Sequence, residues 1–217
     1  MVLYEWFEKN SRAKVNMNSK KAVKQLVAIQ KLTGDINLRL AAEWKSKYKI
    51  LISTILSAQT RDETTIAVCE VLFKRYPSMI KLSRARIGSV EKIIRRVNYH
   101  KTKARNIIAT AKILAGKKIP ETTDELLILP GVGRKVANVY LATAHKMDVI
   151  GVDTHVKRIA FKLNWTKNKN PDKIEKDLMM LFPKKYWIKI NNSLVRFGRT
   201  IGRSRKREDE VLQKLIE

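Results

Sequence analysis

Cysteine is nearly absent from this sequence of 217 residues, in which Cys69 is the only one. One cysteine cannot form a disulfide within the chain, and it cannot provide the set of thiolates that a cysteine-built zinc or iron–sulfur site requires. Cys69 shares the apolar side of a predicted helix with Ile66, Leu72 and Phe73. We therefore expect a buried structural thiol, and neither a metal ion nor another cofactor.

Acidic residues are also few. The sequence contains 46 Lys and Arg but only 20 Asp and Glu, which gives a formal net charge of +26 at pH 7. Such an excess indicates a polyanionic partner, most simply DNA or RNA. A lysine-biased proteome or a ribosomal-type protein is the alternative, and charge alone does not separate an enzyme from a passive binder.

Long apolar runs are missing as well. No uninterrupted apolar stretch approaches the ~18 residues that a transmembrane helix needs, so we expect no membrane partner. Residues 1–6 have neither the basic start nor the long apolar stretch of a secretory signal peptide. The expectation is a cytoplasmic protein without a targeting signal, associated with the nucleoid if the polyanion is DNA.

Glycine and proline are scarce, with 8 and 5 residues, and we expect breaks between helices where they stand, Gly88 among them. Between these breaks, apolar residues recur with the helical period in nearly every segment. A short apolar stretch at 149–152 resembles a strand, but no nearby segment offers it a pairing partner, so we expect an extended connection. The sequence therefore predicts an all-α chain, with helices at about 22–29, 50–56, 63–76, 89–97, 103–114, 123–128, 135–144, 154–163, 171–181, 187–197 and 208–216.

The segment 129–135 (LPGVGRK) lies between two of these predicted helices. Gly131 and Gly133 within one short turn predict positive φ angles and room for a partner to approach the backbone. The turn leads into a helix N-terminus, whose free N–H groups and dipole favour an anion. In so basic a chain, the expected anion is a nucleic-acid phosphate beside these glycines and Arg134.

Three motifs together resemble endonuclease III, a DNA base-excision glycosylase of the helix-hairpin-helix superfamily. They are 55–62 (ILSAQTRD), 129–135 and 152–155 (VDTH), in the same order and with similar spacing. The resemblance extends from about residue 51 to residue 198 and is weak at both ends. It implies an all-α fold of two lobes with the active-site cleft between them. We expect residues 40–146 to form the central bundle with the hairpin, and 1–39 and 147–217 to form the second lobe.

Lys135 is the predicted nucleophile. Near the N-terminus of its helix, the dipole disfavours an ammonium, which suits an amine that must be neutral to attack carbon. The resemblance implies that this lysine attacks the sugar C1′, displaces the damaged base and forms an imine, after which elimination of the 3′ phosphate cuts the strand. A hairpin that only binds DNA would use the same lysine to contact a phosphate.

Asp153 directly precedes a predicted helix and has the residue type preferred at an N-cap. Capping alone would explain an aspartate at this position. The resemblance adds a catalytic role, in which the carboxylate stabilises positive charge on the sugar or helps to deprotonate the lysine amine. The two roles are compatible, because one oxygen can cap the helix while the other faces the cleft.

Other matched positions predict DNA contacts. The resemblance implies that Gln59 fills the gap left by a nucleotide that is flipped out of the duplex, and that Asp62 is an acid near the pocket or a first-turn helix charge. Tyr99 stands where the family has an apolar wedge, although a partly buried structural tyrosine is a rival interpretation. Asn98 replaces the family's glycine before the wedge, and because Asn tolerates positive φ, we expect the turn to be kept. We expect His155 to support the site or face a phosphate rather than bind a metal ion. His100 is expected to contact a phosphate, with a plain surface residue as the alternative.

The C-terminus departs from the family. Endonuclease III usually holds a [4Fe–4S] cluster with four cysteines, but the first three positions here are Gly202, Asp209 and Leu212, which provide no thiolate. We expect a cluster-free variant in which apolar packing of 211–216 replaces the cluster, with Arg203 and Arg205 in a basic run that contacts phosphates. A disordered basic tail is the alternative.

The predicted function is a bifunctional DNA glycosylase and abasic-site lyase that acts, as a monomer, on double-stranded DNA with an oxidised pyrimidine or an abasic site. A mismatch- or purine-directed glycosylase on the same scaffold is one alternative. A non-catalytic helix-hairpin-helix DNA-binding protein is another, but such a protein would have no use for Lys135 and Asp153 together.

Overall fold

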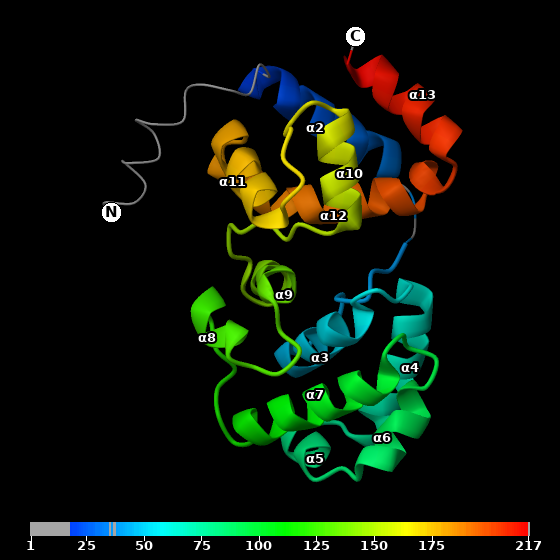
Figure 1. Cartoon of the computed structure of the whole chain (residues 1–217), viewed down its shortest axis with the longest axis vertical. Helices are drawn as coiled ribbons and strands as arrows, with labels where there is room; N and C mark the ends of the chain where they lie inside the picture. Colours follow the sequence, from blue (N-terminus) through cyan, green and yellow to red (C-terminus); the bar gives the residue numbers. More distant parts are fainter. Residues whose placement is uncertain (1–17, 35, 37, 217) are drawn as a thin grey trace. The chain divides into compact units, whose positions relative to one another are not determined.

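The computed structural model of the chain describes residues 18–34, 36 and 38–216. Within these ranges the chain forms helices joined by turns and extended connections, and no strand is present among them, so the prediction of an all-α chain is confirmed (Figure 1). Residues 149–152 form the expected extended connection. The prediction made on residues 1–6 lies outside the described part of the chain.

Two compact units make up the chain. Unit 1 combines residues 1–37 with 150–217, and unit 2 comprises residues 38–149. No helix within the described ranges is both long enough and apolar enough to cross a membrane.

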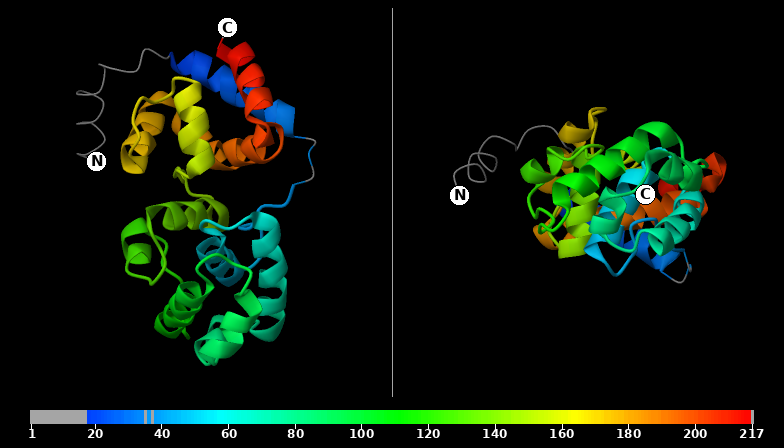
Figure 2. Two further views of the ribbon diagram at one scale, coloured as in Figure 1. Left: turned by 45° about the vertical axis from the view of Figure 1, so that its right-hand side comes forward. Right: turned by 90° about the horizontal axis from the view of Figure 1, so that it is seen from below.

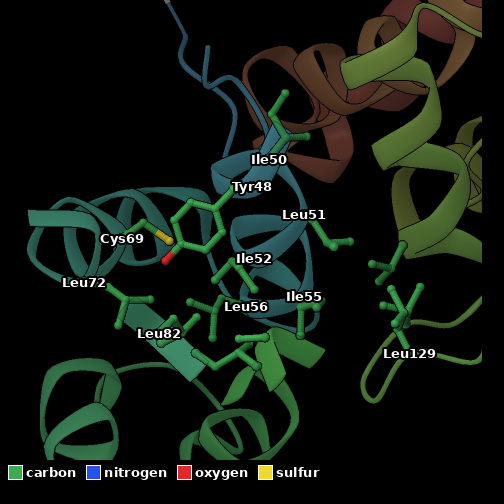
Figure 3. Packing of buried hydrophobic residues seen from close by; sticks show 14 of the residues in the cluster. Tyr48, Ile50, Leu51, Ile52, Ile55, Leu56, Cys69, Leu72, Leu82 and Leu129 are labelled. Carbon is green, nitrogen blue, oxygen red and sulfur yellow. The ribbon is translucent and has the colours of Figure 1, made fainter. Parts of the chain in front are cut away.

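Unit 2 is built around its first helix, α3, which spans Lys47–Ser57. Tyr48 and every residue from 50 to 56 of this helix are buried, because α3 is covered by α4, α7 and α9. Figure 3 shows Ile52, Ile55 and Leu56 inside this core, with Leu129 reaching it from the loop before α9. The other helices of unit 2 are α4 (Asp62–Arg75), α5 (Met79–Ser83), α6 (Ile87–Ile94), α7 (His100–Leu114), α8 (Thr123–Leu127) and α9 (Arg134–His145).

Cys69, on α4, is buried in the same core and faces Tyr48 (Figure 3). Burial is the main cause that raises the pKa of this thiol, so the thiolate is disfavoured. The predicted structural role of Cys69 is confirmed.

Unit 1 holds an N-terminal helix against the C-terminal part of the chain. Gln25, on α2, accepts a hydrogen bond from Trp165 Nε1 at 2.6 Å and donates one to the Leu215 carbonyl at 2.9 Å. Helix α2 therefore lies beside α13 as well as α12 (Figure 2). The helices of unit 1 are α2 (Ser19–Thr33), α10 (Thr154–Lys162), α11 (Pro171–Leu181), η1 (Lys184–Tyr186), α12 (Trp187–Arg199), η2 (Ile201–Arg203) and α13 (Arg205–Ile216).

Several details differ from the sequence prediction, and three of them matter for the fold. The short helix α5 has only five residues, too few for a periodic pattern to reveal it. Gly88 does not break a helix but is the second residue of α6, where a Cβ would meet nothing within 4 Å. Helix α13 begins at Arg205, three residues earlier than expected, so the end of the basic run is helical and the alternative of a disordered tail is wrong.

Candidate active site and nucleic-acid interface

The turn between α8 and α9 has the form of a tight hairpin anchored in the core of unit 2. Leu129 and Val132 are buried, and the Val132 N–H donates to the Leu129 carbonyl at 3.0 Å. The Thr110 hydroxyl on α7 donates to the Pro130 carbonyl at 2.9 Å. The core of unit 2 and α7 therefore hold the hairpin in place, while its two glycines are exposed on the surface.

The two glycines of the hairpin have different roles. Gly131 has φ +81°, and a Cβ there would lie 3.0 Å from Asn106 Cβ and 3.2 Å from Ile55 Cγ2. Gly133 has φ −98° and ψ 174°, and a Cβ there would meet nothing within 4 Å. The expected positive φ is confirmed for Gly131 and wrong for Gly133, which is the N-cap of α9 instead.

Lys135 is the second residue of α9 and is half-buried, whereas Arg134 before it is exposed. Glycine has no side chain with which to cap a helix, so Gly133 leaves the first-turn N–H groups of α9 to other acceptors. Lys135 therefore lies in the first turn of α9, at the positive end of the helix dipole.

A second lysine lies close to Lys135. Lys103, on α7, is buried, and its Nζ donates to the Leu56 carbonyl at 2.8 Å, to the Ala58 carbonyl and to Thr60 Oγ1 at 3.2 Å. Burial, and then the charge of Lys135, lower the pKa of Lys103 to about 8. Sequence reasoning missed this residue, although Lys103 shares an apolar face with Ile107 at i+4, which is an unusual place for a lysine.

Gln59 and Tyr99 both have left-handed backbone conformations. Gln59, after α3, has φ 54°, and Tyr99, the N-cap of α7, has φ 59°. Both side chains are exposed, Tyr99 to 66%, so the interpretation of Tyr99 as a partly buried structural residue is wrong. Asn98 is not the residue with positive φ, contrary to expectation. Its side chain instead donates to the Gln59 carbonyl.

Asp62 and His100 are the first residues of α4 and α7, respectively, and both are half-buried. Asp62 follows Gln59 by three residues and begins a helix, where a carboxylate is favoured by the dipole. These two residues belong to unit 2 together with Gln59, Tyr99 and Lys135.

Asp153 belongs to unit 1 and caps α10. Its Oδ1 accepts hydrogen bonds from the N–H groups of His155 at 2.9 Å and Val156 at 2.8 Å. The predicted capping role is confirmed. Because Oδ1 accepts both bonds, Oδ2 of this half-buried carboxylate is left for another partner.

His155 is packed closely behind this cap. A Cβ on Gly198 of α12 would overlap the His155 ring, so only glycine allows this contact. Burial lowers the pKa of His155 below its ordinary value. The charge of Arg158 lowers this pKa further, while the charge of Asp153 raises it but does not outweigh burial. His155 is therefore held mainly in its neutral form near pH 7.

The basic C-terminal region is organised around a buried carboxylate. Glu208, on α13, is 0% exposed and accepts hydrogen bonds from Arg158 and from Lys162 of α10. Burial raises the pKa of Glu208, but the hydrogen bonds from Arg158 and Lys162 outweigh it and hold the pKa below its ordinary value. Arg203 and Arg205 are exposed on either side of Ser204.

This region does not fit a thiolate-bound cluster. A Cβ on Gly202 would overlap Glu208 Oε2, so the Glu208 carboxylate fills the space over that glycine. Leu212 is buried in the apolar core of unit 1, and Asp209 pairs with Lys162. Besides the expected apolar packing, the buried ion pairs of Glu208 hold this region together. No group of three or more His, Cys, Asp or Glu side chains is arranged to hold a metal ion within the described ranges.

A family model described as HhH-GPD superfamily base excision DNA repair protein matches residues 52–184. The chain is similar to endonuclease III of Thermotoga maritima, with 38% identity over 178 residues that cover 80% of this chain and 84% of that protein. It is 34% identical to endonuclease III of Synechocystis over 197 residues, which cover 89% of each. A solved structure of a trapped endonuclease III–DNA covalent intermediate matches with a TM-score of 0.79 and 30% identity, over 87% of this chain and 89% of that chain.

Proposed function

The chain belongs to the endonuclease III family, within the HhH-GPD superfamily of base excision DNA repair proteins, and on this premise we propose that it acts on duplex DNA containing an oxidised pyrimidine or an abasic site. The protein is a base excision repair enzyme, a DNA glycosylase and abasic-site lyase. The position of Lys135 at the start of α9, directly after the hairpin, carries the proposal. An amine at that position supports the lyase step as well as base removal.

In the proposed reaction the neutral Lys135 amine attacks C1′ of the damaged nucleotide. The bond between C1′ and the base nitrogen breaks, and the base leaves with a proton. The sugar ring opens to give an imine between C1′ and Lys135 Nζ. Loss of a proton from C2′ then breaks the bond from C3′ to its phosphate oxygen, which cuts the strand, and water hydrolyses the imine to free the lysine.

Asp153 is the proposed electrostatic partner of this chemistry. Oδ1 is occupied by the two N–H groups of the α10 cap, and Oδ2 is the atom that we assign to the sugar. A fixed carboxylate favours the positive charge that develops on the sugar and the imine. Because the cap fixes the carboxylate before substrate binds, little reorganisation is needed during the reaction.

Exposed residues of unit 2 are the proposed contacts to the DNA. The N-terminus of α9, with Gly131, Gly133 and Arg134, would bind a backbone phosphate, as helix N-termini do. Gln59 and Tyr99 would enter the base stack when the damaged nucleotide is extruded. Arg203 and Arg205 of unit 1 would contact further phosphates. With a net charge of +26, most of the affinity would come from the backbone and fall steeply with salt.

Borohydride trapping on a duplex with one abasic site tests the proposal. Reduction of the imine should link the full-length protein covalently to the DNA, and Lys135→Ala should abolish the linked product while undamaged duplex is still bound. The matched control is Lys112→Ala, which removes an exposed lysine of α7 that has no assigned role. A wild-type protein that binds DNA without any trapped product would lack the lyase step, and one that also releases no base would be a non-catalytic binder. A panel of single-lesion duplexes then identifies the excised base, and sedimentation measures whether the enzyme is the proposed monomer.

A further inference from the structure

Lys103 is a buried charged residue that the proposed reaction does not use. Its side chain is 7% exposed, and its three hydrogen-bond acceptors come from the end of α3 and the loop that follows. The Leu56 carbonyl belongs to the last turn of α3, where carbonyl groups have no partner within the helix. An ammonium at this end of a helix also matches the negative end of the dipole. Lys103 therefore binds the C-terminus of α3 from the neighbouring helix α7.

The loop that Lys103 binds contains Gln59 in a left-handed conformation, with φ 54°. Residues other than glycine rarely adopt this conformation, and they keep it only where the surrounding structure holds them. Lys103 binds the residues on both sides of Gln59, namely Ala58 through its carbonyl and Thr60 through its hydroxyl. The flanks of Gln59 are thus fixed by a single ammonium.

Asn98 holds the same loop from a second direction. Its backbone N–H donates to Thr60 Oγ1 at 3.2 Å, and its side-chain amide donates to the carbonyl of Gln59 itself. Thr60 Oγ1 accepts from both Asn98 and Lys103 and donates to the Ala58 carbonyl at 3.4 Å. The carbonyl groups on both sides of Gln59, its own and that of Ala58, are therefore bound by Asn98 and by Lys103, respectively.

The hydrogen bonds that hold Gln59 also involve the loop before α7. The Lys103 N–H donates to the Tyr99 carbonyl at 2.9 Å, so Tyr99 and Lys103 are one helical turn apart. Asn98 directly precedes Tyr99, whose φ of 59° turns its exposed side chain outward. The contacts that hold Gln59 consequently hold the start of Tyr99's helix as well.

We propose that Lys103, Thr60 and Asn98 form a latch that holds the Gln59 loop ready to enter the DNA stack, so that Lys103 is a positioning residue for nucleotide extrusion. This inference rests on the proposed function, in which Gln59 fills the gap in the duplex. A loop that is already fixed loses less conformational freedom on binding than a loop that must be ordered by the DNA. The side chain of Gln59 is exposed and available for insertion, while the latch holds its backbone.

The proposed latch acts on extrusion, and comparing a duplex with a single strand isolates that step, because an effect of the Lys103 charge on Lys135 would change both rates. A single-stranded oligonucleotide with an abasic site has no base stack to enter, whereas the same site in a duplex does. Lys103→Met removes the three donors and keeps most of the length of the side chain. We expect borohydride trapping of Lys103→Met on the duplex to slow by about tenfold relative to trapping on the single strand.

Two further variants separate positioning from folding. Lys103→Arg keeps a charged donor and should recover part of the duplex rate, because a guanidinium can also donate to carbonyl groups. Asn98→Ala removes the contact to the Gln59 carbonyl from an exposed position and should slow duplex trapping even if Lys103→Met fails to fold. The matched control is Lys112→Met, the same charge change at an exposed site on the same helix. It should leave the ratio of duplex to single-strand rates unchanged.

These experiments distinguish a failure of the proposed latch from a failure of the proposed function. A wild-type protein that traps neither substrate would refute the glycosylase and lyase chemistry itself. Equal slowing of Lys103→Met on duplex and single strand would refute the latch, as would a wild-type ratio for Asn98→Ala. The fluorescence of 2-aminopurine placed opposite a tetrahydrofuran abasic analogue gives an independent readout, since a smaller fluorescence change in the latch variants means less insertion into the stack.

Discussion

Arg158 binds the buried carboxylate of Glu208 with both ends of its guanidinium, from Nε to Oε1 at 2.9 Å and from Nη2 to Oε2 at 2.7 Å. Lys162, one turn further along α10, donates to Oε1 at 2.7 Å. These hydrogen bonds join α13 to α10, the helix that Asp153 caps. The C-terminal helix is therefore docked by charge as well as by the apolar residues around Leu212.

Replacing Glu208 with Gln should destabilise unit 1 strongly. Gln keeps one acceptor oxygen but loses the negative charge and turns the second acceptor into an NH₂ donor that faces Arg158 and Lys162. Loss of one member of a buried ion pair typically lowers the free energy of unfolding by about 3–5 kcal/mol. Denaturant unfolding followed by tryptophan fluorescence measures it, since Trp165 and Trp187 are buried in unit 1. Glu210→Gln on the exposed side of α13 is the control and should change the unfolding free energy by less than about 0.5 kcal/mol.

The same carboxylate predicts a loss of stability in acid. The pKa of Glu208 is lower in the folded protein than its ordinary value of 4.5, so the unfolded chain takes up a proton first as the pH falls. The contribution of Glu208 is complete above that ordinary value and is lost as the pH falls through the folded pKa. Unfolding free energies of the wild type should therefore decline below about pH 4.5 more steeply than those of Glu208→Gln. Parallel curves for the two proteins would contradict this assignment.

The two hairpin glycines should respond differently to alanine. Gly131→Ala places a Cβ in a left-handed conformation and 3.0 Å from Asn106, so we expect a loss of about 1–3 kcal/mol in stability and weaker binding to duplex DNA. At Gly133 φ is ordinary and an added Cβ would contact nothing within 4 Å, so Gly133→Ala only removes a residue that is favourable at an N-cap. The loss in unfolding free energy should therefore be smaller, about 0.5 kcal/mol. Thermal unfolding and a filter-binding assay compare the pair. Equal losses would mean that the hairpin is not held as described.

Two substitutions at Asp153 separate capping from catalysis. Asn caps helices about as well as Asp, so Asp153→Asn should change the unfolding free energy by less than about 0.5 kcal/mol. It should nevertheless slow single-turnover cleavage by roughly 10²–10³-fold, because the carboxylate charge that we propose to stabilise the sugar is lost. Asp153→Ala removes the cap too and should lower stability by about 1 kcal/mol more. Wild-type turnover by Asp153→Asn would leave capping as the residue's whole role.

Several parts of the fold could be predicted from the sequence because they depend on neighbouring residues. The helical period located every helix from α2 to α13 except the short α5. The predicted bounds of α11 match the observed ones, and Pro171, a breaker that can start a helix, marks its first residue. Asp153 was recognisable as an N-cap for the same reason. The positive φ of Gly131 followed from its place in a short turn between two helices.

Other features involve partners that are distant in the chain, and no local pattern predicts them. Lys103 meets the Leu56 carbonyl 47 residues away, and Glu208 meets Arg158 50 residues away. The role of Asn98 was predicted wrongly for this reason, because its contact with Gln59 depends on how two loops meet.

The sequence by itself determined which segments become helices, where the hairpin turns and that Lys135 starts a helix, because hydrophobic period, caps and glycine conformations act within a few residues. Only the tertiary structure decided which charged groups are buried and which atoms bind them. A lysine or glutamate is stable inside a protein only where acceptors or donors from other helices surround it, and folding alone brings those atoms together.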